Sequence, residues 1–392
     1  MWCTTDRKDL ANVLVAINQI ADPRSPIPVL RHARLSVTAG VLAVTGTDLD
    51  TRLEIRLPCA ADAVDGEALV EARRLRDYVK SAAASRTTVE ADASGVRIRA
   101  GASSVKWSAG APLEDFPVLT VKPCGRATLP AGTFRRMLRT VKHAVGTEST
   151  RPELQGVLLH APTSGFRAAA TDGHRLALAE HPASNVTDLA GMPGMILPAS
   201  AVKVLADLLP ADDAVPLTIG WSSPSADMSA GRVSFDFGLV SLSTRPIDKQ
   251  FPDYARVVPE HAGRSITAAR KPLLEAVKRA ALARERKDSA ILLRVADGLF
   301  NLTAGTEDGA AVEPVPDAVI ENIERLELGL NARYLSEALG AMSGSMARLS
   351  VHATAPESHA IRLDSPGEAG ITHVIMPMRI QGRRPQAEGE TA

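Results

Sequence analysis

The stretch AATDGHRL (169–176) occurs in related form at two other places in the chain, as VTGTDLDT (44–51) and TAGTEDGA (303–310). Each copy follows a short apolar run and places a threonine directly before an acidic residue. The threonines are Thr47, Thr171 and Thr306, which lie 124 and then 135 residues apart. A nearly constant spacing of this kind is typical of a repeated structural unit.

A second landmark repeats with nearly the same spacing. The segments VEARRLRDYV (70–79), LPASAVKVLA (197–206) and LNARYLSEAL (330–339) align without gaps on Ala72, Ala199 and Ala332. Their offsets are 127 and 133 residues, close to those of the Thr-acid pairs. Two independent landmarks therefore indicate three copies of one unit of roughly 130 residues.

Each unit combines a helical pattern with strand patterns. Apolar residues at helical spacing open the units, namely Leu10, Leu14 and Ile17, then Phe134, Leu138, Val141 and Val145, then Leu274, Val277 and Ala281. Alternating segments broken by a glycine-containing turn follow at 33–46, 156–170 and 291–304. The sequence predicts an α+β fold of three similar domains, each with two helices packed on antiparallel sheet.

Two linkers interrupt these patterns. Proline and a turn-forming acid occur in APLEDFPVL (111–119) and in KQFPDYARVVPE (249–260). We therefore expect domains over residues 1–122, 123–257 and 258–380. The polar tail QGRRPQAEGETA (381–392) is expected to be disordered.

The composition is that of an intracellular globular protein. Hydrophobic residues make up 45% and charged residues 23%, and 45 Lys and Arg balance 45 Asp and Glu. A nucleic-acid partner would therefore have to meet positive charge gathered on one face. Cys3, Cys59 and Cys124 form no C-x-x-C pair, and no stretch approaches the ~20 apolar residues of a membrane span. We expect a cytoplasmic protein without a metal or cofactor.

Asp172 and His174, beside Arg175, are residue types that bind metals or transfer protons. A catalytic metal site needs about three protein ligands, and no further ligand motif accompanies this pair. The other repeats carry Asp50 and Gly309 at the histidine position. That difference favours a turn in which the acid accepts backbone N–H groups. A metal-dependent enzyme using Asp172 and His174 stays the less favoured alternative.

These motifs together resemble the bacterial DNA polymerase III β subunit family, the replicative sliding clamps. The resemblance spans residues 5–380 and rests on RSPIPVLRHARL (24–35), GTDLD (46–50), EDFP (114–117), ATDGHRLAL (170–178), FPDYARVVP (251–259) and VIMPMRI (374–380). It implies three similar domains that pair head to tail with a second copy as a dimeric ring around duplex DNA. SAILLRV (289–295) and the residues after 380 depart from the family pattern. A specialised clamp paralogue, serving a repair polymerase or resisting an inhibitor, is therefore the main alternative.

The resemblance also implies a groove for partner peptides between the second and third domains. The matching residues are Leu154, Thr171, His174, Arg175, Leu176, Pro252, Arg256, Val257, Val374, Met376, Pro377, Met378 and Arg379. Two methionines beside leucine and valine would form an adaptable apolar floor. Arginine and threonine at the rim would fix a polar residue of the partner. The expected partners are the replicative polymerase, the clamp loader and other proteins that carry clamp-binding peptides.

Basic residues recur on the first helix of the second and third units, away from the apolar stripe. If these helices line a ring, their side chains would meet phosphates without reading bases. The resemblance adds two further basic positions of the DNA-facing surface, Arg24 and Arg73. The full set of DNA-facing candidates is Arg24, Arg73, Arg135, Arg139, Lys142, Lys271 and Lys278.

Ring closure is expected at a sheet edge. SSVKWSAG (103–110) alternates and places Val105 and Trp107 on one side. In the family this strand meets the third domain of the other protomer, near the residues that match Leu282 and Ala283. The sequence thus predicts a non-catalytic homodimer that keeps a DNA polymerase on duplex DNA by raising its effective concentration there. The chain has no G-x-x-x-x-G-K-[ST] loop, so loading would require a separate ATP-driven opener.

Overall fold

The computed structural model describes residues 1–378 except 109, 163–164, 187, 190, 223–230, 261–262, 284–289 and 307–308. Arg379 of the expected groove and the tail 381–392 lie outside the described residues. By internal contacts the chain divides into two compact units, and each is treated by itself below. The first unit comprises Met1–Arg136, His160–Phe166 and Pro182–Asp248, and the second comprises Met137–Leu159, Arg167–His181 and the residues from Lys249 onward.

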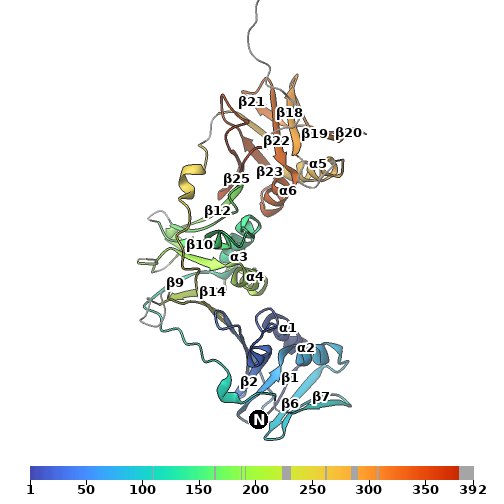
Figure 1. Cartoon of the computed structure of the whole chain (residues 1–392), viewed down its shortest axis with the longest axis vertical. Helices are drawn as coiled ribbons and strands as arrows, with labels where there is room; N and C mark the ends of the chain where they lie inside the picture. Colours follow the sequence, from blue (N-terminus) through green and yellow to red (C-terminus); the bar gives the residue numbers. More distant parts are fainter. Residues whose placement is uncertain are drawn as a thin grey trace, which may run out of the picture. The chain divides into compact units, whose positions relative to one another are not determined.

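One order of elements occurs three times along the chain (Figure 1). Each copy reads strand, helix, four strands, helix, three strands, and the copies begin at β1, β9 and β17. The third copy has one additional strand, β21 (Val319–Glu321). This order confirms the predicted α+β class with three similar copies.

Six α-helices occur in the part of the chain that the structure describes. They are α1 (Arg7–Ile17), α2 (Ala72–Ser81), α3 (Ala131–Val141), α4 (Ala199–Leu208), α5 (Arg270–Leu282) and α6 (Ala332–Ala341). Two of them begin at a side-chain cap that satisfies free backbone donors. Asp6 accepts hydrogen bonds from the N–H groups of Lys8 and Asp9, and Asn331 accepts from those of Arg333 and Tyr334.

The predicted apolar stripe is confirmed in the first copy and shifted in the third. In the second copy three of its four residues are confirmed, whereas Val145 lies beyond α3 and is half-buried. The stripe residues of α1, and Phe134, Leu138 and Val141 of α3, are buried. On α5 the fully buried residues are Leu273, Val277 and Ala280, with Leu274 and Ala281 only partly buried against the same core. The α5 sequence is apolar at both sets of positions, so its spacing could not decide which set faces inward.

The strands of the first unit form two antiparallel sheets. One runs β1 (Trp2–Asp6), β6 (Arg86–Asp92), β7 (Gly95–Ala100), β8 (Ser103–Trp107). The other runs β5 (Gly66–Glu71), β2 (His32–Thr38), β3 (Val41–Thr47), β4 (Arg52–Pro58), β16 (Val240–Thr244), β15 (Val233–Phe237), β14 (Pro216–Trp221), β9 (Gly125–Pro130). The short β13 (Met195–Pro198) precedes α4.

The second unit repeats this arrangement. One run of strands is β10 (Gly156–His160), β11 (Gly165–Thr171), β12 (Arg175–Pro182), β25 (Glu368–Ile375), β24 (Ile361–Ser365), β23 (Met346–Ser350), β17 (Ser265–Ala269), β21. A separate sheet runs β20 (Gly309–Pro314), β19 (Leu299–Thr306), β18 (Ala290–Ala296), β22 (Leu326–Asn331).

Neighbouring copies are joined by one kind of strand pair, which we call a junction. The strand β4 of the first copy pairs antiparallel with β16 of the second. The strand β12 of the second copy pairs in the same way with β25 of the third. The strands β8 and β20 hold the corresponding places in the remaining two sheets, where each is the terminal strand.

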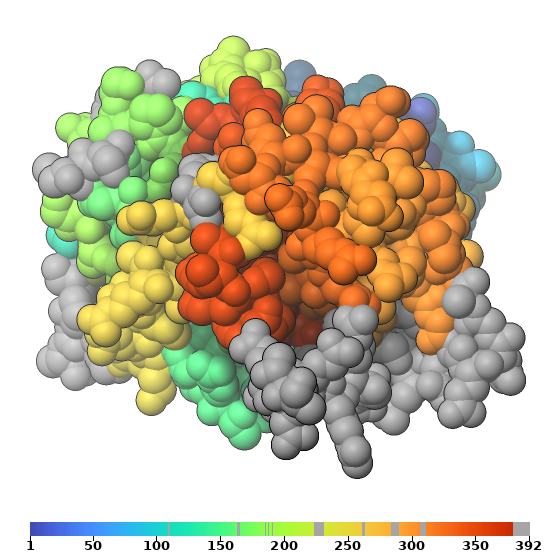
Figure 2. Space-filling view, turned by 90° about the horizontal axis from the view of Figure 1, so that it is seen from above, coloured from blue at the N-terminus to red at the C-terminus, as the bar shows by residue number. Residues whose placement is uncertain are grey.

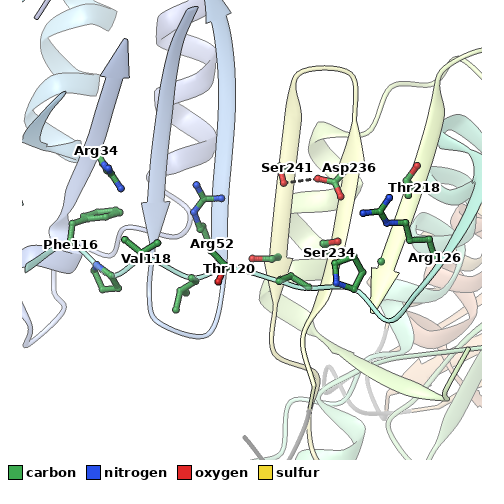
Figure 3. A pocket seen from close by; sticks show the side chains of 16 residues that line it. Arg34, Arg52, Phe116, Val118, Thr120, Arg126, Thr218, Ser234, Asp236 and Ser241 are labelled. Atoms are coloured by element: carbon green, nitrogen blue, oxygen red, sulfur yellow. Dashed lines mark hydrogen bonds between the residues drawn. The ribbon is translucent and has the colours of Figure 1, made fainter. Parts of the chain in front are cut away.

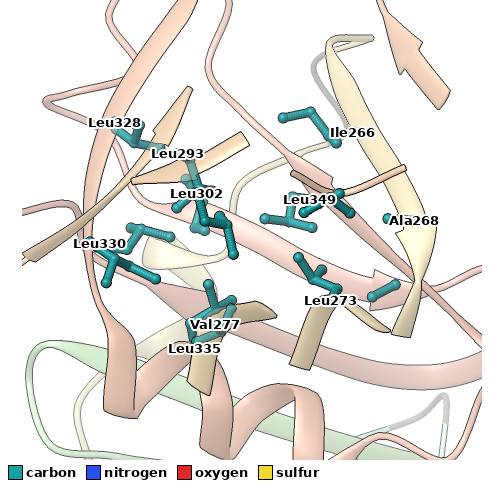
Figure 4. Close-up of a cluster of buried hydrophobic side chains, with 14 of the residues drawn as sticks. Ile266, Ala268, Leu273, Val277, Leu293, Leu302, Leu328, Leu330, Leu335 and Leu349 are labelled. Carbon is teal, nitrogen blue, oxygen red and sulfur yellow. The ribbon is translucent and has the colours of Figure 1, made fainter. Parts of the chain in front are cut away.

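The core of the third copy shows how helices and sheet are held together (Figure 4). Leu273 and Val277 of α5 and Leu335 of α6 are fully buried against Leu293 and Leu302 of the β18–β19 hairpin. Burying one such side chain contributes about 1.5–3 kcal/mol. In the space-filling view, residues of this copy form one densely packed body coloured orange to red (Figure 2). No helix in the described residues is long and apolar enough to cross a membrane.

Candidate functional site

The turn between β11 and β12 is built from side chain–backbone hydrogen bonds. Asp172 Oδ1 accepts from the N–H groups of His174 (2.9 Å) and Arg175 (3.0 Å). Thr171 Oγ1 donates to Arg175 O at 2.7 Å and accepts from Gly173 N–H at 3.1 Å. Gly173 has φ +90°, a conformation that glycine adopts without strain. The acid is thus used to shape a turn, as the sequence comparison predicted.

The corresponding turn between β3 and β4 has the same hydrogen bonds. Thr47 Oγ1 donates to Thr51 O at 2.9 Å and accepts from Leu49 N–H at 3.1 Å. Asp48 Oδ1 accepts from Thr51 N–H at 2.6 Å, and Leu49 takes the positive-φ position with φ 82°. Two of the three Thr-acid pairs therefore mark one repeated turn. The third includes Glu307, which lies outside the described residues.

Only 7% of the Arg175 surface is accessible. The side chain is therefore buried beside the turn and does not lie at an exposed rim. Its Nε is 3.0 Å from Asp172 Oδ2, and its Nη1 forms a second ion pair with Glu337 of α6. Its guanidinium carbon is 4.3 Å from the centre of the Tyr334 ring, within reach of a cation–π interaction. The expectation that Arg175 fixes a partner's polar residue is corrected here. Its charge is already paired with Asp172 and Glu337, which hold its side chain beside the turn.

Two histidines lie next to Arg175. His143 Nε2 is 3.3 Å from His373 Nδ1, and His143 Nδ1 is 3.4 Å from Arg175 Nη1. Burial, the His373 ring and the Arg175 charge lower the pKa of His143 to about 3. Burial chiefly lowers the pKa of His373 to about 4. Both rings are therefore neutral near pH 7, which avoids placing three positive charges side by side. Within the described residues, no three His, Cys, Asp or Glu side chains are placed to hold a metal ion.

An apolar cluster lies where β12 pairs with β25. Leu176 and Val374 are opposite each other in this antiparallel pair. They form a buried cluster with Ala169, Leu178 and Tyr254. Partly buried Leu158, Phe251, Val258 and Ala360 pack against it. We refer to these nine residues as the apolar cluster. Leu154, which was also expected in the groove, is buried but is not a member of this cluster.

The segment after β25 runs past the turn with its apolar side chains accessible. Met376 N–H donates to His174 O at 2.9 Å, and Met378 N–H donates to Gly329 O at 2.8 Å. Met376 is 42% exposed, whereas Pro377 and Met378 are half-buried. These bonds hold the backbone while leaving the methionine side chains free to adapt to a bound chain.

The linker after the second copy contributes a further part of the same surface. Its helical turn Tyr254–Val257 anchors Tyr254 in the apolar cluster. Val257 is 53% exposed, and Pro252 is exposed as well. Arg256 is exposed and pairs with Asp253 at 2.8 Å. The structure therefore brings the β12, β25 and linker candidates to one surface. Sequence comparison did not identify the cluster residues Phe251 and Tyr254, although the Phe-Pro pair at 251–252 repeats that at 116–117.

The candidate DNA-facing residues differ in how much of their charge is free. Arg24, Arg73 and Lys278 each pair with an acid within one turn of chain, and half-buried Arg135 lies 3.5 Å from a backbone carbonyl. Arg139, Lys142 and Lys271 are exposed, and no ion pair joins them to another residue in the described ranges.

The candidate interface residues lie at sheet and helix ends. Val105 and Trp107 are half-buried on β8, and the Trp107 ring packs edge-on against Tyr78 at 6.1 Å between centres. Leu282, at the end of α5, is 86% exposed, and Ala283 follows as its C-cap. An apolar residue this accessible beside an unpaired strand edge is typical of a protein contact.

Comparison with known proteins assigns all three copies to one family. Models of the DNA polymerase III beta subunit match as its N-terminal domain at residues 1–120, its central domain at 128–253 and its C-terminal domain at 255–379. The beta sliding clamp of Caulobacter vibrioides is 31% identical over 389 residues, covering 97% of this chain and 100% of the relative.

Solved structures agree. The beta sliding clamp of C. crescentus superposes with a TM-score of 0.85 at 29% identity, covering 97% of this chain and 99% of the other. The sliding clamp of Bartonella birtlesii bound to griselimycin gives 0.85 at 27% identity, with coverages of 97% and 100%. The fold is therefore the three-domain clamp fold. The chain belongs to the DNA polymerase III beta subunit family, whose members are non-catalytic processivity factors. Its function is that of a sliding clamp, so Asp172 and His174 are not catalytic groups.

Proposed function

We propose that two copies of the chain close into a ring around duplex DNA, and that each copy holds partner peptides on the surface over its apolar cluster. The observation that carries the ring is the repeated junction. Within the described chain, β4 pairs with β16 and β12 pairs with β25, while β20 and β8 each end a sheet.

Ring closure follows from the order of elements. The strands β4, β12 and β20 occupy the same place in their copies, as do β8, β16 and β25. A second chain can therefore complete the series, with β20 of one protomer pairing with β8 of its partner. Applied twice, this pairing covers the edges of β8 and β20 in both protomers, and exposed edges of this kind are ones that a soluble sheet protein otherwise has to protect. Val105, Trp107, Leu282 and Ala283 are the residues we place at this contact.

Peptide docking is supported by the chemistry of the exposed surface. Leu176 and Val374 supply a fixed apolar base, and Met376 and Met378 supply adaptable side chains above the backbone bonds that hold them. Val257 adds an exposed apolar side chain from the linker. The remaining groove candidates are Leu154, Thr171, His174, Arg175, Pro252, Arg256, Pro377 and Arg379. We propose that the replicative polymerase and the clamp loader present apolar peptides to this surface in turn.

Contact with DNA would be weak and independent of sequence. Arg139, Lys142 and Lys271 offer unpaired charge to phosphates, with Arg24, Arg73, Arg135 and Lys278 as secondary contributors. Charge–phosphate contacts of this kind weaken steeply with salt and allow sliding. We place this activity in the cytoplasm, and we assign the three clamp domains to residues 1–122, 123–257 and 258–380.

Retention on DNA of different topology tests the ring. The chain is loaded by a clamp loader and ATP onto nicked circular DNA, and the DNA is then linearised at one site. We expect retention on the circle and rapid loss after linearisation, with a protein mass in solution of twice the chain mass. Equal loss from both forms of DNA, or a monomer at micromolar concentration, would contradict the proposal.

A further inference from the structure

The junction of β4 with β16 has the same backbone frame as the junction that carries the apolar cluster. After β16, Arg245 N–H donates to Asp50 O at 3.0 Å, and after β25, Met376 N–H donates to His174 O at 2.9 Å. Two residues later, Ile247 N–H donates to Ile196 O at 2.9 Å, as Met378 N–H does to Gly329 O. Together with the shared Thr-acid turn, these bonds define one frame that occurs twice.

The side chains on the two frames have opposite character. In the second unit, Leu176 faces Val374 across the junction. In the first unit, the corresponding residue is Arg52, the first residue of β4, and it faces Ser243. Two residues further along each strand, Leu178 of the apolar cluster corresponds to Glu54. The frame that presents an apolar surface in one copy therefore presents charged and hydroxyl groups in the other.

A linker also crosses both frames. Phe251 and Pro252 begin the crossing in the second unit, and Phe116 and Pro117 begin it in the first. Phe116 is buried, and from there residues 117–123 run across the sheet as a strap (Figure 3). A cavity of about 510 Å³ lies between this strap and the sheet. That volume lies within the ~300–1,000 Å³ of typical ligand sites.

The floor of the cavity is a row of short residues, two serines and a glycine, with an arginine at each end. Arg52 pairs with Ser243, Ser243 with Ser234, Ser234 with Gly220, and Gly220 with Arg126, each on the next strand. Four strand steps of ~4.8 Å place the ends of this row ~19 Å apart. An extended chain that rises ~3.4 Å per residue would cover this distance in five or six residues.

The charge of the lining favours an anionic chain. Three arginines line the cavity, namely Arg34, Arg52 and Arg126, and Asp236 is the one acid in the lining. Asp236 Oδ1 already accepts a hydrogen bond from Ser241. In the described residues, exposed Arg126 has no ion-pair partner.

The other two arginines are already paired with glutamates, so they would share their charge between these acids and a bound carboxylate. Arg52 pairs with Glu54, which Arg56 also contacts. Arg34 binds Glu67 through Nη2 alone, and its buried Nε has no hydrogen-bond partner in the described structure.

We propose that this strapped cavity is a second peptide site, which takes an extended acidic segment of a partner protein with two carboxylates about five residues apart. One carboxylate binds at Arg52 and Arg34, and the other binds at Arg126. The serine and glycine floor lies beneath the peptide between them, and the strap covers it. The site differs from the apolar groove in place and in chemistry, so one chain can hold two dissimilar segments at once.

A peptide array tests this site with the full-length chain as labelled probe. The peptides have Ser/Gly/Thr backgrounds and two glutamates at varied separation, and each has a twin with glutamine in both places. We expect glutamate-dependent binding with an optimum near five residues. Because a charge-assisted hydrogen bond is lost, Arg126→Gln should weaken it about tenfold or more. The control Arg99→Gln, at another exposed arginine on β7, should leave it unchanged.

Three outcomes would overturn the proposal. The first is equal binding of glutamate peptides and their glutamine twins, or none by either. The second is binding that Arg126→Gln does not alter, or that a peptide of the apolar groove displaces. The third is Arg126-dependent binding of a short single-stranded oligonucleotide in place of the acidic peptides. Melting temperatures of both variants are measured alongside, and Arg126 has no ion pair in the described chain whose loss could unfold it.

Discussion

His143 Nε2 and His373 Nδ1 lie 3.3 Å apart, and His143 Nδ1 is 3.4 Å from the Arg175 guanidinium. Both imidazoles stay neutral because burial and the neighbouring positive charge oppose protonation. The turn that carries the groove therefore rests on a pair of histidines that must not be charged.

We expect this pair to make stability depend on pH on the acidic side. The pKa values of His143 and His373 fall from an ordinary 6.5 to about 3 and about 4 in the folded chain. The unfolded chain thus binds more protons below pH 6.5, so stability is complete above that pH and is lost as the pH falls toward 4. Urea unfolding at several pH values should show a loss of about 5 kcal/mol by pH 4.5, because each of the two histidines contributes about half of it.

The variant His143→Phe provides the control for this pH dependence. It replaces one imidazole with a ring of similar size that cannot be protonated, so the slope of stability against pH should fall by about half. An unchanged slope would show that other groups cause the acid sensitivity.

Removing the Arg175 side chain should destabilise the second unit. Arg175→Ala leaves Asp172 and Glu337 without their shared cation in a partly buried site. We expect a loss of about 2–3 kcal/mol in the free energy of unfolding and weaker peptide binding, because the turn loses its support. Arg256→Ala, which breaks an exposed ion pair, should cost less than about 1 kcal/mol. Equal losses for the two variants would contradict the positioning role of Arg175.

A charge on the exposed methionine should block the groove selectively. Met376→Asp places a carboxylate among apolar contacts without disturbing the core, since Met376 is 42% exposed and does not belong to the buried core. We expect a clamp-binding peptide to lose at least about tenfold in affinity, measured by fluorescence anisotropy. The melting temperature should stay within about 2 °C of the parent. Unaltered affinity would place the docking surface elsewhere.

A charge at the end of α5 should separate the protomers. Leu282→Asp introduces a carboxylate at the proposed contact and should raise the dimer dissociation constant by about tenfold or more in analytical ultracentrifugation. Val64→Asp is the matched control, because Val64 is also an exposed apolar residue but bridges to Trp2 of β1, at the opposite end of the sheet from β8. Isolated chains of the two variants should be equally stable. A dimer that tolerates both substitutions would exclude this edge.

Neutralising free charges should change retention on DNA more than neutralising paired ones. Arg139→Gln with Lys142→Gln removes two side chains that are exposed and have no ion pair in the described structure. We expect the slope of log affinity against log salt to fall by about 4 in the dimer, or about 2 for each protomer. Arg24→Gln should change it less, because Asp22 already pairs with Arg24 at 3.2 Å. Equal slopes would show that Arg139 and Lys142 do not meet phosphates.

The sequence predicts well those features that repeat along the chain. The Thr-acid pairs at Thr47 and Thr171 were interpreted as turns, and both turns have the same side-chain hydrogen bonds. The apolar spacing of α1 also identifies its buried face, because that helix has one apolar stripe.

Features that depend on contacts across the fold could not be predicted in this way. On α5, apolar residues lie at two adjacent sets of positions, and only packing against the sheet selects Leu273 and Ala280. Arg175 was expected at a rim because neither Glu337 nor Tyr334 is near it in sequence. The polar site around Arg52 corresponds in position to the apolar cluster of the second unit. It could not be predicted from the sequence either, because only strand register brings its residues together.

The terminal strands β8 and β20 give each chain two different ends for pairing. A subunit with only its β20 edge blocked still offers an intact β8 edge to a normal subunit. It would occupy that subunit's β20 edge without completing a circle. In a cell that makes both normal and one-ended subunits, even a minority of one-ended subunits would hold normal subunits in incomplete rings. The defect would therefore be genetically dominant.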